Sequence, residues 1–195
     1  MLFSRPVLNA APQPTLGGDG IILRAPIASD YEAWAALRDS SRDHLRPFEP
    51  AWAEDELSPA SFRYRLKRYQ HEARNDQGYS FFVLDPAGRA LLGGISLSSV
   101  RRGASQTASV GYWMGAPFCG HGYATAALRR ICDYAFAELS LHRLEAASMP
   151  SNAASLRVLD KVGFEREGLA RRYLKINGAW EDHVLLARIA EEDTG

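Results

Sequence analysis

Hydrophobic and polar positions change their spacing several times along the chain, and the first changes predict a strand followed by two helices. The apolar run "IILRAP", which starts at Ile21, predicts the strand. Apolar residues then recur at helical spacing in two stretches, one after a capping-box pair, Ser29 and Glu32, and one from Ser58 and Pro59. The expected apolar faces carry Ala33, Trp34 and Leu37 in the first helix, and Phe62, Leu66 and Tyr69 in the second.

Strand patterns dominate the middle of the chain. The segments "YSFFVLD", "ALLGGISLSSV" and "TASVGYWM" are separated by turn signals and predict an antiparallel meander. A helical period follows from Thr125, then a strand, "HRLEAASM", and a short helix that Ser151 or Asn152 would cap and Gly163 would end. A hairpin signal, "NG" at 177–178, closes the series. This order predicts an α/β (α+β) fold with one strand-helix-strand crossover.

Length and composition favour a single compact domain. The 195 residues are 46% hydrophobic, and we expect the domain to span residues 21–191. Residues 1–20, rich in proline and glycine, are expected to form an irregular arm, and residues 192–195 a tail. The N-terminus lacks the apolar core of a signal peptide, and no run approaches the roughly 18 apolar residues of a membrane span. We therefore expect a soluble, cytoplasmic protein without a membrane partner.

Charge and cysteine content point away from nucleic acid, disulfides and metals. Lys plus Arg and Asp plus Glu both number 23, so no net charge would attract nucleic acid. A local basic cluster, Arg63, Arg65, Lys67 and Arg68, would either contact ribosomal RNA or form the solvated face of an amphipathic helix, and its interleaved apolar residues favour the second. Two cysteines and five histidines without ligand spacing predict a reducing compartment and no metal site.

Gly120 and Gly122 lie immediately before the helical period that starts at Thr125. A helix start presents unpaired N–H groups and the positive end of the helix dipole, which together bind phosphates. Glycines there permit positive φ and let amides curl around an anion, while Ala124 is small and Thr125 adds a hydroxyl. An ordinary glycine loop is the alternative. Walker and Rossmann loops are excluded, because the Lys-Ser/Thr pair and the third glycine are absent.

Four separated segments resemble one family. "VGYWMGAPFCGHGYATAAL" resembles the acetyl-CoA-binding motif of the Gcn5-related N-acetyltransferases (GNAT), and "MPSNAASLRVLDKVGFEREG" is similar to their second CoA-contacting segment. "YLKINGAWEDHVLL" resembles the RimJ/RimL branch of ribosomal-protein N-terminal acetyltransferases, and "HLRPFEPAW" and "GISLSSV" look closer to its alanine-specific members. The resemblance covers nearly the whole domain. It implies acetyl-CoA as cosubstrate and a mixed, mostly antiparallel sheet with a central splayed parallel strand pair and flanking helices.

The resemblance also implies which residues bind the cosubstrate. Backbone groups near Trp113 and Met114 would pair with the pantetheine arm in the gap between the splayed strands, although core packing alone also explains their side chains. Asn152 matches a position that bonds the same arm, and N-capping explains it equally well. Cys119 stands where many family members carry Arg or Gln. This difference bears on how tightly CoA binds more than on whether it binds. The pyrophosphate loop would comprise Cys119, Gly120, His121, Gly122, Tyr123, Ala124 and Thr125.

Acetyl transfer to an amine requires a neutral nucleophile, a polarised thioester carbonyl and a proton for the departing thiolate. By resemblance, Ser155 is the candidate proton donor, with helix capping as the alternative. The glutamate proposed as base in the branch falls on Leu174 here, so we prefer Glu49, which two prolines hold in a rigid loop. The alternatives are that Glu49 only orients the amine or is solvated, that Asp182 or His183 is the base, or that a chain of waters is.

The acceptor is expected to be the N-terminus of a protein such as a ribosomal protein, with alanine first. An α-amine with a pKa of about 7.8 is roughly one-seventh neutral at pH 7, whereas lysine at about 10.4 is below one in a thousand, so a weak base suffices. Phe48, Trp52 and Tyr173 would form a tight cleft, or pack the core. A covalent route through Cys119 or Cys132 is disfavoured by their positions.

Two other functions stay open. A relative that acetylates a small amine, an antibiotic or a peptide toxin would use the same CoA site. A CoA-binding sensor without turnover is the non-enzymatic alternative, and Leu174 and Cys119 are its only hints. The oligomeric state, monomer or homodimer, is also open.

Overall fold

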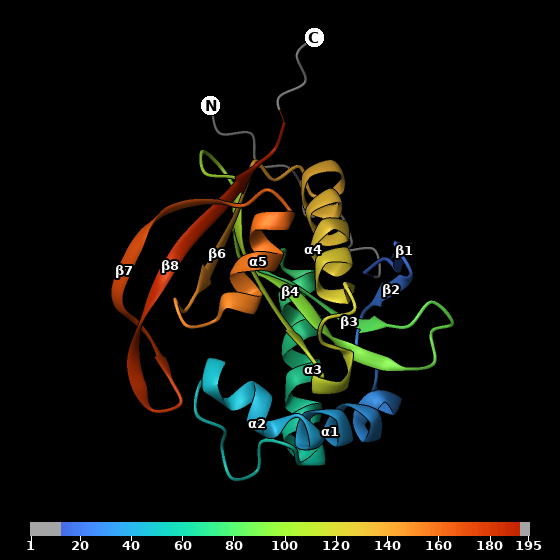
Figure 1. The fold of residues 1–195 in the computed structure, drawn as a ribbon. Helices are drawn as coiled ribbons and strands as arrows, with labels where there is room; N and C mark the ends of the chain where they lie inside the picture. The colour runs from blue at the N-terminus through green and yellow to red at the C-terminus, as the bar shows by residue number, and fades with distance from the viewer. Residues whose placement is uncertain (1–12, 192–195) are drawn as a thin grey trace.

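Within residues 13–191, which the computed structural model describes, eight strands form one twisted sheet (Figure 1). In this part of the chain the strand order is β1-β2-β3-β4-β5-β6-β8-β7, and all neighbours pair antiparallel except β5 and β6. The predicted mixed sheet with one parallel pair is confirmed. The strands are β1 (Leu16–Gly18), β2 (Ile21–Arg24), β3 (Tyr79–Leu84), β4 (Leu91–Arg101), β5 (Thr107–Met114), β6 (Arg143–Ser148), β7 (Glu165–Ile176) and β8 (Ala179–Ile189).

Helices cover both faces of the sheet (Figure 1). α4 (Tyr123–Asp133) and α5 (Ala153–Lys161) pack on one face. α1 (Tyr31–Ser40) and α3 (Pro59–Arg74) pack on the other, and the short α2 (Arg42–Leu45) follows α1. Single turns of other helix types occur at η1 (Ala28–Asp30), η2 (Arg46–Phe48) and η3 (Ala116–Phe118), and α4 continues into a π-helical segment, η4 (Tyr134–Glu138).

The hydrophobic core is divided by the sheet into two clusters. The larger cluster lies under α4 and α5, and the smaller lies under α1 and α3. Because side chains alternate along a strand, neighbouring residues of β5 enter different clusters: Tyr112 and Met114 pack in the first, and Trp113 in the second. The fully buried side chains of the larger cluster include Leu23, Phe81, Leu128, Ile131, Leu144, Leu159 and Leu186.

Most of the local sequence signals are confirmed. Ser58 caps α3, since its hydroxyl accepts a hydrogen bond from the Ser61 amide at 3.1 Å. Asn152 caps α5 in the same way through the Ser155 amide at 3.0 Å. These bonds satisfy amides that have no acceptor within their own helix. As predicted, Gly163 follows the end of α5, and Asn177-Gly178 joins β7 to β8.

Three local predictions were wrong. Residues 16–18, placed in an irregular arm, form β1, where Leu16 is 2% exposed; residues 1–12 of that arm lie outside the described residues. Ser29 does not cap α1, because it lies inside the 3-10 turn η1, and α1 begins after Asp30 without a side-chain capping bond. α4 starts at Tyr123, before the expected start. β1 depends on its pairing with β2, an interaction that the local pattern of residues 16–18 does not contain.

We predict that Gly93→Ala lowers the free energy of unfolding by about 2 kcal/mol, as overpacking typically does. A Cβ at Gly93 would overlap with the Trp113 carbonyl oxygen and lie 2.8 Å from Met114 Sδ, which forces β4 and β5 apart. Gly111→Ala is the matched control on the same strand pair, because its Cβ would meet nothing within 4 Å. Equal urea midpoints for the two variants would contradict the prediction.

Candidate active site

The site is organised around the separation of β5 and β6. Their parallel pairing covers only Thr107–Ser109 with Arg143–Glu145. Beyond this, β5 follows β4 as far as Met114, and β6 follows β8 as far as Ser148. The two strands therefore part, and their facing main-chain edges lie open to a ligand. The predicted splayed parallel pair is confirmed.

The glycine loop leads from β5 into α4. Gly120 and Gly122 have φ of +81° and +86°, and a Cβ at either would meet no protein atom within 4 Å. Positive φ, and not crowding, is therefore what requires glycine. The first bond of α4 runs from the Ala126 amide to Gly122 O at 3.0 Å, so the amides of residues 123–125 have no acceptor within the helix. This arrangement of amides can bind a phosphate.

The side chains of the glycine loop contribute little to phosphate binding beside these amides. His121 is exposed, and its ring stacks on Tyr123 with 5.9 Å between centroids. Ala124 and Thr125 are half-buried in the first turn of α4. Cys119 is exposed, and its sulfur lies 3.3 Å from His44 Nε2.

Neither cysteine is suited to form a covalent intermediate. Partial burial raises the pKa of the Cys119 thiol, and complete burial in α4 raises the pKa of Cys132 to about 12. The thiolate is the nucleophilic form, so both thiols are weak nucleophiles at neutral pH. This agrees with direct attack by the amine.

Ser155 has a partner across the gap that the sequence did not reveal. Its hydroxyl lies 3.0 Å from the phenol oxygen of Tyr112, and the phenol also lies 3.2 Å from the Ser155 carbonyl oxygen, to which it can donate. Burial raises the pKa of Tyr112 to about 12, against a smaller opposing effect of the Ser155 hydrogen bond. The phenol is thus protonated at neutral pH. The alternation of side chains in "VGYWM" places Tyr112 and Trp113 on opposite faces of the sheet. This alternation was the one sequence signal that could have placed Tyr112 on the Ser155 side.

Trp113 and Met114 pack as their side chains were expected to do. Met114 is 7% exposed in the larger cluster. The Trp113 indole lies against Gly94 of β4, where a Cβ would be 2.5 Å from its Nε1. Their backbone follows the β5 edge that faces the gap, because the other edge is bonded to β4.

Glu49 is held by two residues on the α1/α3 side of the sheet. Its carboxylate accepts hydrogen bonds from Arg38 at 2.6 and 3.2 Å and from Trp52 Nε1 at 2.7 Å. Arg38 is 6% exposed, and its guanidinium lies 4.6 Å from the Trp52 ring and 5.0 Å from the Trp113 ring. The ion pair therefore joins α1, the Glu49 loop and β5. No pattern in the sequence singled out Arg38.

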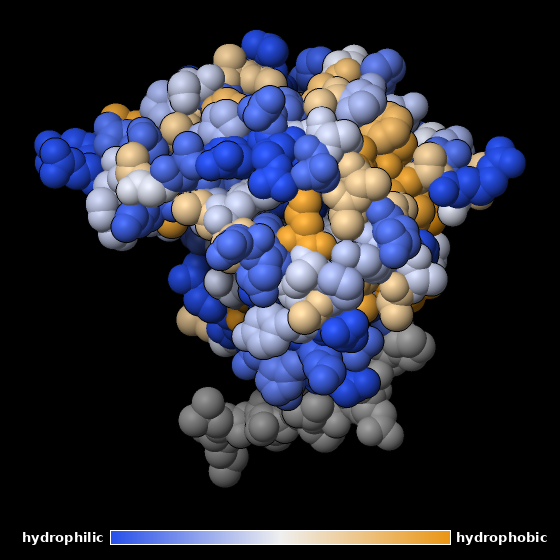
Figure 2. All heavy atoms as spheres, turned by 90° about the horizontal axis from the view of Figure 1, so that it is seen from below, coloured by the Kyte–Doolittle hydropathy of each residue, from blue (hydrophilic) through white to orange (hydrophobic). Residues whose placement is uncertain are grey.

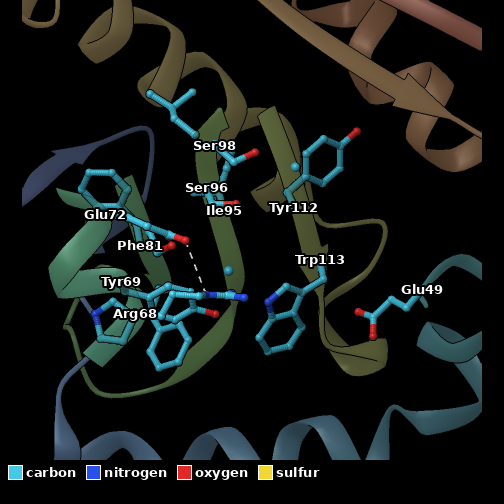
Figure 3. A pocket seen from close by; sticks show the side chains of 16 residues that line it. Glu49, Arg68, Tyr69, Glu72, Phe81, Ile95, Ser96, Ser98, Tyr112 and Trp113 are labelled. Carbon is cyan, nitrogen blue, oxygen red and sulfur yellow. Dashed lines mark ion pairs between the residues drawn. The ribbon is translucent and has the colours of Figure 1, made fainter. Parts of the chain in front are cut away.

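A cavity of about 340 Å³ opens beneath α3, against β3, β4 and β5. Figure 3 shows Arg68 and Glu72 of α3 on one side of Trp113 and Glu49 on the other. Tyr112 points away from Trp113 in the same view, towards the opposite side of the sheet. The cavity thus lies against β5 on the side of the sheet that carries the carboxylates.

The aromatic residues of the expected cleft have different surroundings. The indole N–H of Trp52 donates a hydrogen bond to Glu49, whereas Phe48 and Tyr173 are 37% and 49% exposed. The Asn177 amide donates to Glu49 O at 2.9 Å, which ties the Glu49 loop to the β7–β8 hairpin. Phe48 and Tyr173 therefore stand on segments that touch.

The hairpin offers no better candidate for a base. Leu174 is 41% exposed on β7 and has no proton acceptor in its side chain. Asp182 accepts a hydrogen bond from the Arg172 amide at 2.8 Å, and His183 is buried with Nδ1 3.0 Å from Glu181 O. The Asp182 bond joins β7 to β8, whereas the His183 contact lies within β8.

The basic cluster of α3 is divided by its contacts. Arg65 forms an ion pair with Glu56, and Arg68 lies 3.6 Å from Glu72, while Arg63 and Lys67 are exposed. Figure 2, viewed from the α1 and α2 end, shows hydrophilic side chains over much of this face and hydrophobic ones near its middle. Such pairing fits an amphipathic helix, and RNA contact stays untested.

In the described part of the chain, no group of three or more His, Cys, Asp or Glu residues is arranged to hold a metal ion. Among the helices of residues 13–191, none has both the length and the apolar character that a membrane crossing needs.

Comparisons with known proteins agree with this geometry. The family model "Acetyltransferase (GNAT) domain" matches residues 21–165. The chain is 40% identical over 178 residues to the probable N-acetyltransferase YjcK of Bacillus subtilis, covering 91% of this chain and 98% of that protein. It is 32% identical over 178 residues to the [ribosomal protein uS5]-alanine N-acetyltransferase of Escherichia coli, covering 90% and 91%.

A solved structure extends the agreement to three dimensions. Mycobacterium smegmatis RimJ in complex with CoA-disulfide matches with a TM-score of 0.84 and 36% identity, covering 90% of this chain and 84% of that chain. The family model covers most of the domain, and the relatives align over nearly their whole length. This chain therefore belongs to the GNAT acetyltransferase family and is related to the ribosomal-protein N-acetyltransferases.

Proposed function

We propose that this protein uses acetyl-CoA to acetylate the N-terminal α-amine of a protein substrate such as a ribosomal protein, with alanine as the first residue. The observation that carries the proposal is the separation of β5 and β6 after Ser109 and Glu145, beside a helix start lined by Gly120 and Gly122. The first offers main-chain groups to an extended arm, and the second offers amides to a pyrophosphate. CoA has both parts.

The residues present fit acetyl-CoA, which would supply the activated acetyl group. The open edge of β5 near Trp113 and Met114 bonds the pantetheine amides as an added strand would. Asn152 uses its side-chain oxygen to cap α5, so its amide N–H groups stay available to the arm. The amides at the start of α4 bind the pyrophosphate, and this backbone binding makes the Cys119 substitution tolerable.

Ser155 is the proposed proton donor to the departing sulfur. Its hydroxyl is oriented by Tyr112, whose phenol keeps its own proton because burial raises its pKa to about 12. A hydroxyl that is already oriented needs no rearrangement when the carbon–sulfur bond breaks, which is the advantage of a preorganised donor.

Glu49 is proposed to receive the incoming amine. Oε2 of Glu49 accepts hydrogen bonds from both Arg38 and Trp52, whereas Oε1 accepts one from Arg38 and can accept a further bond. The cavity is also bordered by Glu72 and Arg68, which lie 3.6 Å apart as an ion pair, so Glu49 is the carboxylate proposed to meet the ammonium ion. Glu49 thus orients the amine and accepts its proton, and its fixed position favours a defined approach.

An α-amine suits this site better than a lysine side chain. With a pKa of about 7.8 the α-amine is already partly neutral at pH 7, so the carboxylate of Glu49 needs to deprotonate a smaller fraction of it. The relatedness to an alanine N-acetyltransferase of ribosomal protein uS5 supports the same acceptor class. A small first residue follows if Phe48 and Tyr173 narrow the entrance.

Gly122→Val is expected to weaken acetyl-CoA binding at least tenfold, about 1.4 kcal/mol, because valine resists the positive φ that aims the amides. Titration calorimetry measures the change. Gly103→Val is the matched control: Gly103 has φ of +70° and equally open surroundings in the loop between β4 and β5. If both variants bind like the wild-type protein, the loop is not the pyrophosphate site.

Ser155→Ala should lower kcat about a hundredfold while the dissociation constant of acetyl-CoA changes little, since the hydroxyl acts only as the thiolate leaves. Tyr112→Phe should lower kcat less, because the serine keeps its proton but loses its partner. The rate of thiol release at saturating substrates gives kcat, and calorimetry gives the affinity for acetyl-CoA. A loss of affinity without a loss of kcat would make Ser155 a binding or capping residue.

Paired peptides test the acceptor. One has a free N-terminal alanine and no lysine, and the other is blocked at its N-terminus and carries an internal lysine. The free alanine is expected to react faster, and a peptide starting with tryptophan more slowly. Faster reaction of the blocked peptide would refute the acceptor class. A panel of small amines and antibiotics addresses the alternative substrates, and absence of thiol release with every acceptor would leave only CoA binding.

A further inference from the structure

Ser148, the last residue of β6, carries a buried hydroxyl without a partner. The residue is 4% exposed, and its Oγ has no hydrogen-bond partner among the described residues. Its opposite neighbour on β8 is Val184, whose side chain offers no polar atom. A buried hydroxyl that forms no hydrogen bond destabilises a folded protein, so its retention needs an explanation.

The strand register places Ser148 at the gap. The last parallel pair is Ser109 with Glu145, and three residues further on the two strands carry Tyr112 and Ser148. Residues at equal register in a parallel pair face the same side of the sheet. The burial pattern of β6 supports this placement. Leu144, Ala146 and Ser148 are the buried residues of the strand, and the first two belong to the α4/α5 cluster, so Ser148 faces the same side.

Three hydroxyl groups thus border one side of the separated strands. Tyr112 lies on the β5 side, and Ser148 and Ser155 lie on the β6–α5 side. Tyr112 and Ser155 lie 3.0 Å apart, which leaves Ser148 as the member whose bond must come from elsewhere. A polar ligand in the gap would satisfy it.

We propose that the Ser148 hydroxyl forms a hydrogen bond with the sulfur-bearing end of bound CoA and its thioesters. The inference rests on the proposed function, in which the pantetheine arm lies between β5 and β6. Ser155, oriented by Tyr112, then donates to the departing sulfur, while Ser148 holds the same end of the arm in place from β6. Ser148 is a binding residue in this arrangement.

Ser148→Ala tests the proposal because the two readouts change in different directions. Without CoA, the variant should be as stable as the wild-type protein or more so in urea unfolding, since the change removes an unsatisfied buried group. Its affinity for CoA, measured by calorimetry, should fall about fivefold, the loss expected for one hydrogen bond. Ser80→Ala is the control: Ser80 is also buried but lies on the α3 side of β3, and CoA affinity should be unchanged.

Each outcome separates this inference from the proposed function. A wild-type protein that does not bind CoA would overturn both. Normal CoA binding by Ser148→Ala would overturn only the role of Ser148, as would a variant that loses stability while its affinity stays unchanged, because the hydroxyl would then have a purely structural partner.

Discussion

β5 and β6 hydrogen-bond to each other only between Thr107–Ser109 and Arg143–Glu145, because each is held along its remaining length by a different neighbour. Beyond these residues β5 stays hydrogen-bonded to β4, and β6 stays hydrogen-bonded to β8, so the two strands diverge. Main-chain groups at an open strand edge need a partner, and a ligand with an amide-bearing arm can supply it. The glycine loop, α4 and α5 are all placed relative to this opening.

Strand alternation then divides the chemistry between the two faces. Tyr112 and Trp113 are adjacent in β5 but enter different clusters. Hydroxyl groups, which can donate protons, gather on the α4/α5 face, and carboxylates border the cavity on the α1/α3 face. In the proposed mechanism, an amine that approaches from the second face meets a proton acceptor, while the sulfur leaves towards a proton donor.

The ion pair of Arg38 and Glu49 has a structural role beside its proposed chemical one. Arg38 is almost completely buried, so removal of its carboxylate partner would leave an unpaired buried charge, typically at a cost of about 3–5 kcal/mol. The Glu49 backbone also bonds to Asn177 of the hairpin turn. One residue thus links α1, the loop after η2 and the β7–β8 hairpin, and itself borders the cavity beside β5.

The sequence by itself determined the features that depend on a few neighbouring residues. Helix caps at Ser58 and Asn152, the positive φ at Gly120 and Gly122 and the turn at 177–178 follow from local backbone chemistry, and the change from strand to helix spacing follows from burial of one face. The quoted segments that resemble the GNAT motifs were enough to predict the family and its splayed strands.

Only the tertiary structure decided which distant residues meet. Tyr112 and Ser155 are 43 positions apart, and the partner of Glu49 is a charged residue in α1 that resembles any other residue on a helix face. The pairing of Leu16–Gly18 with β2 and the unpartnered hydroxyl of Ser148 belong to the same class. Hydrogen bonds act over about 3 Å, so their partners are selected by how strands and helices pack, and spacing along the chain carries no record of that selection.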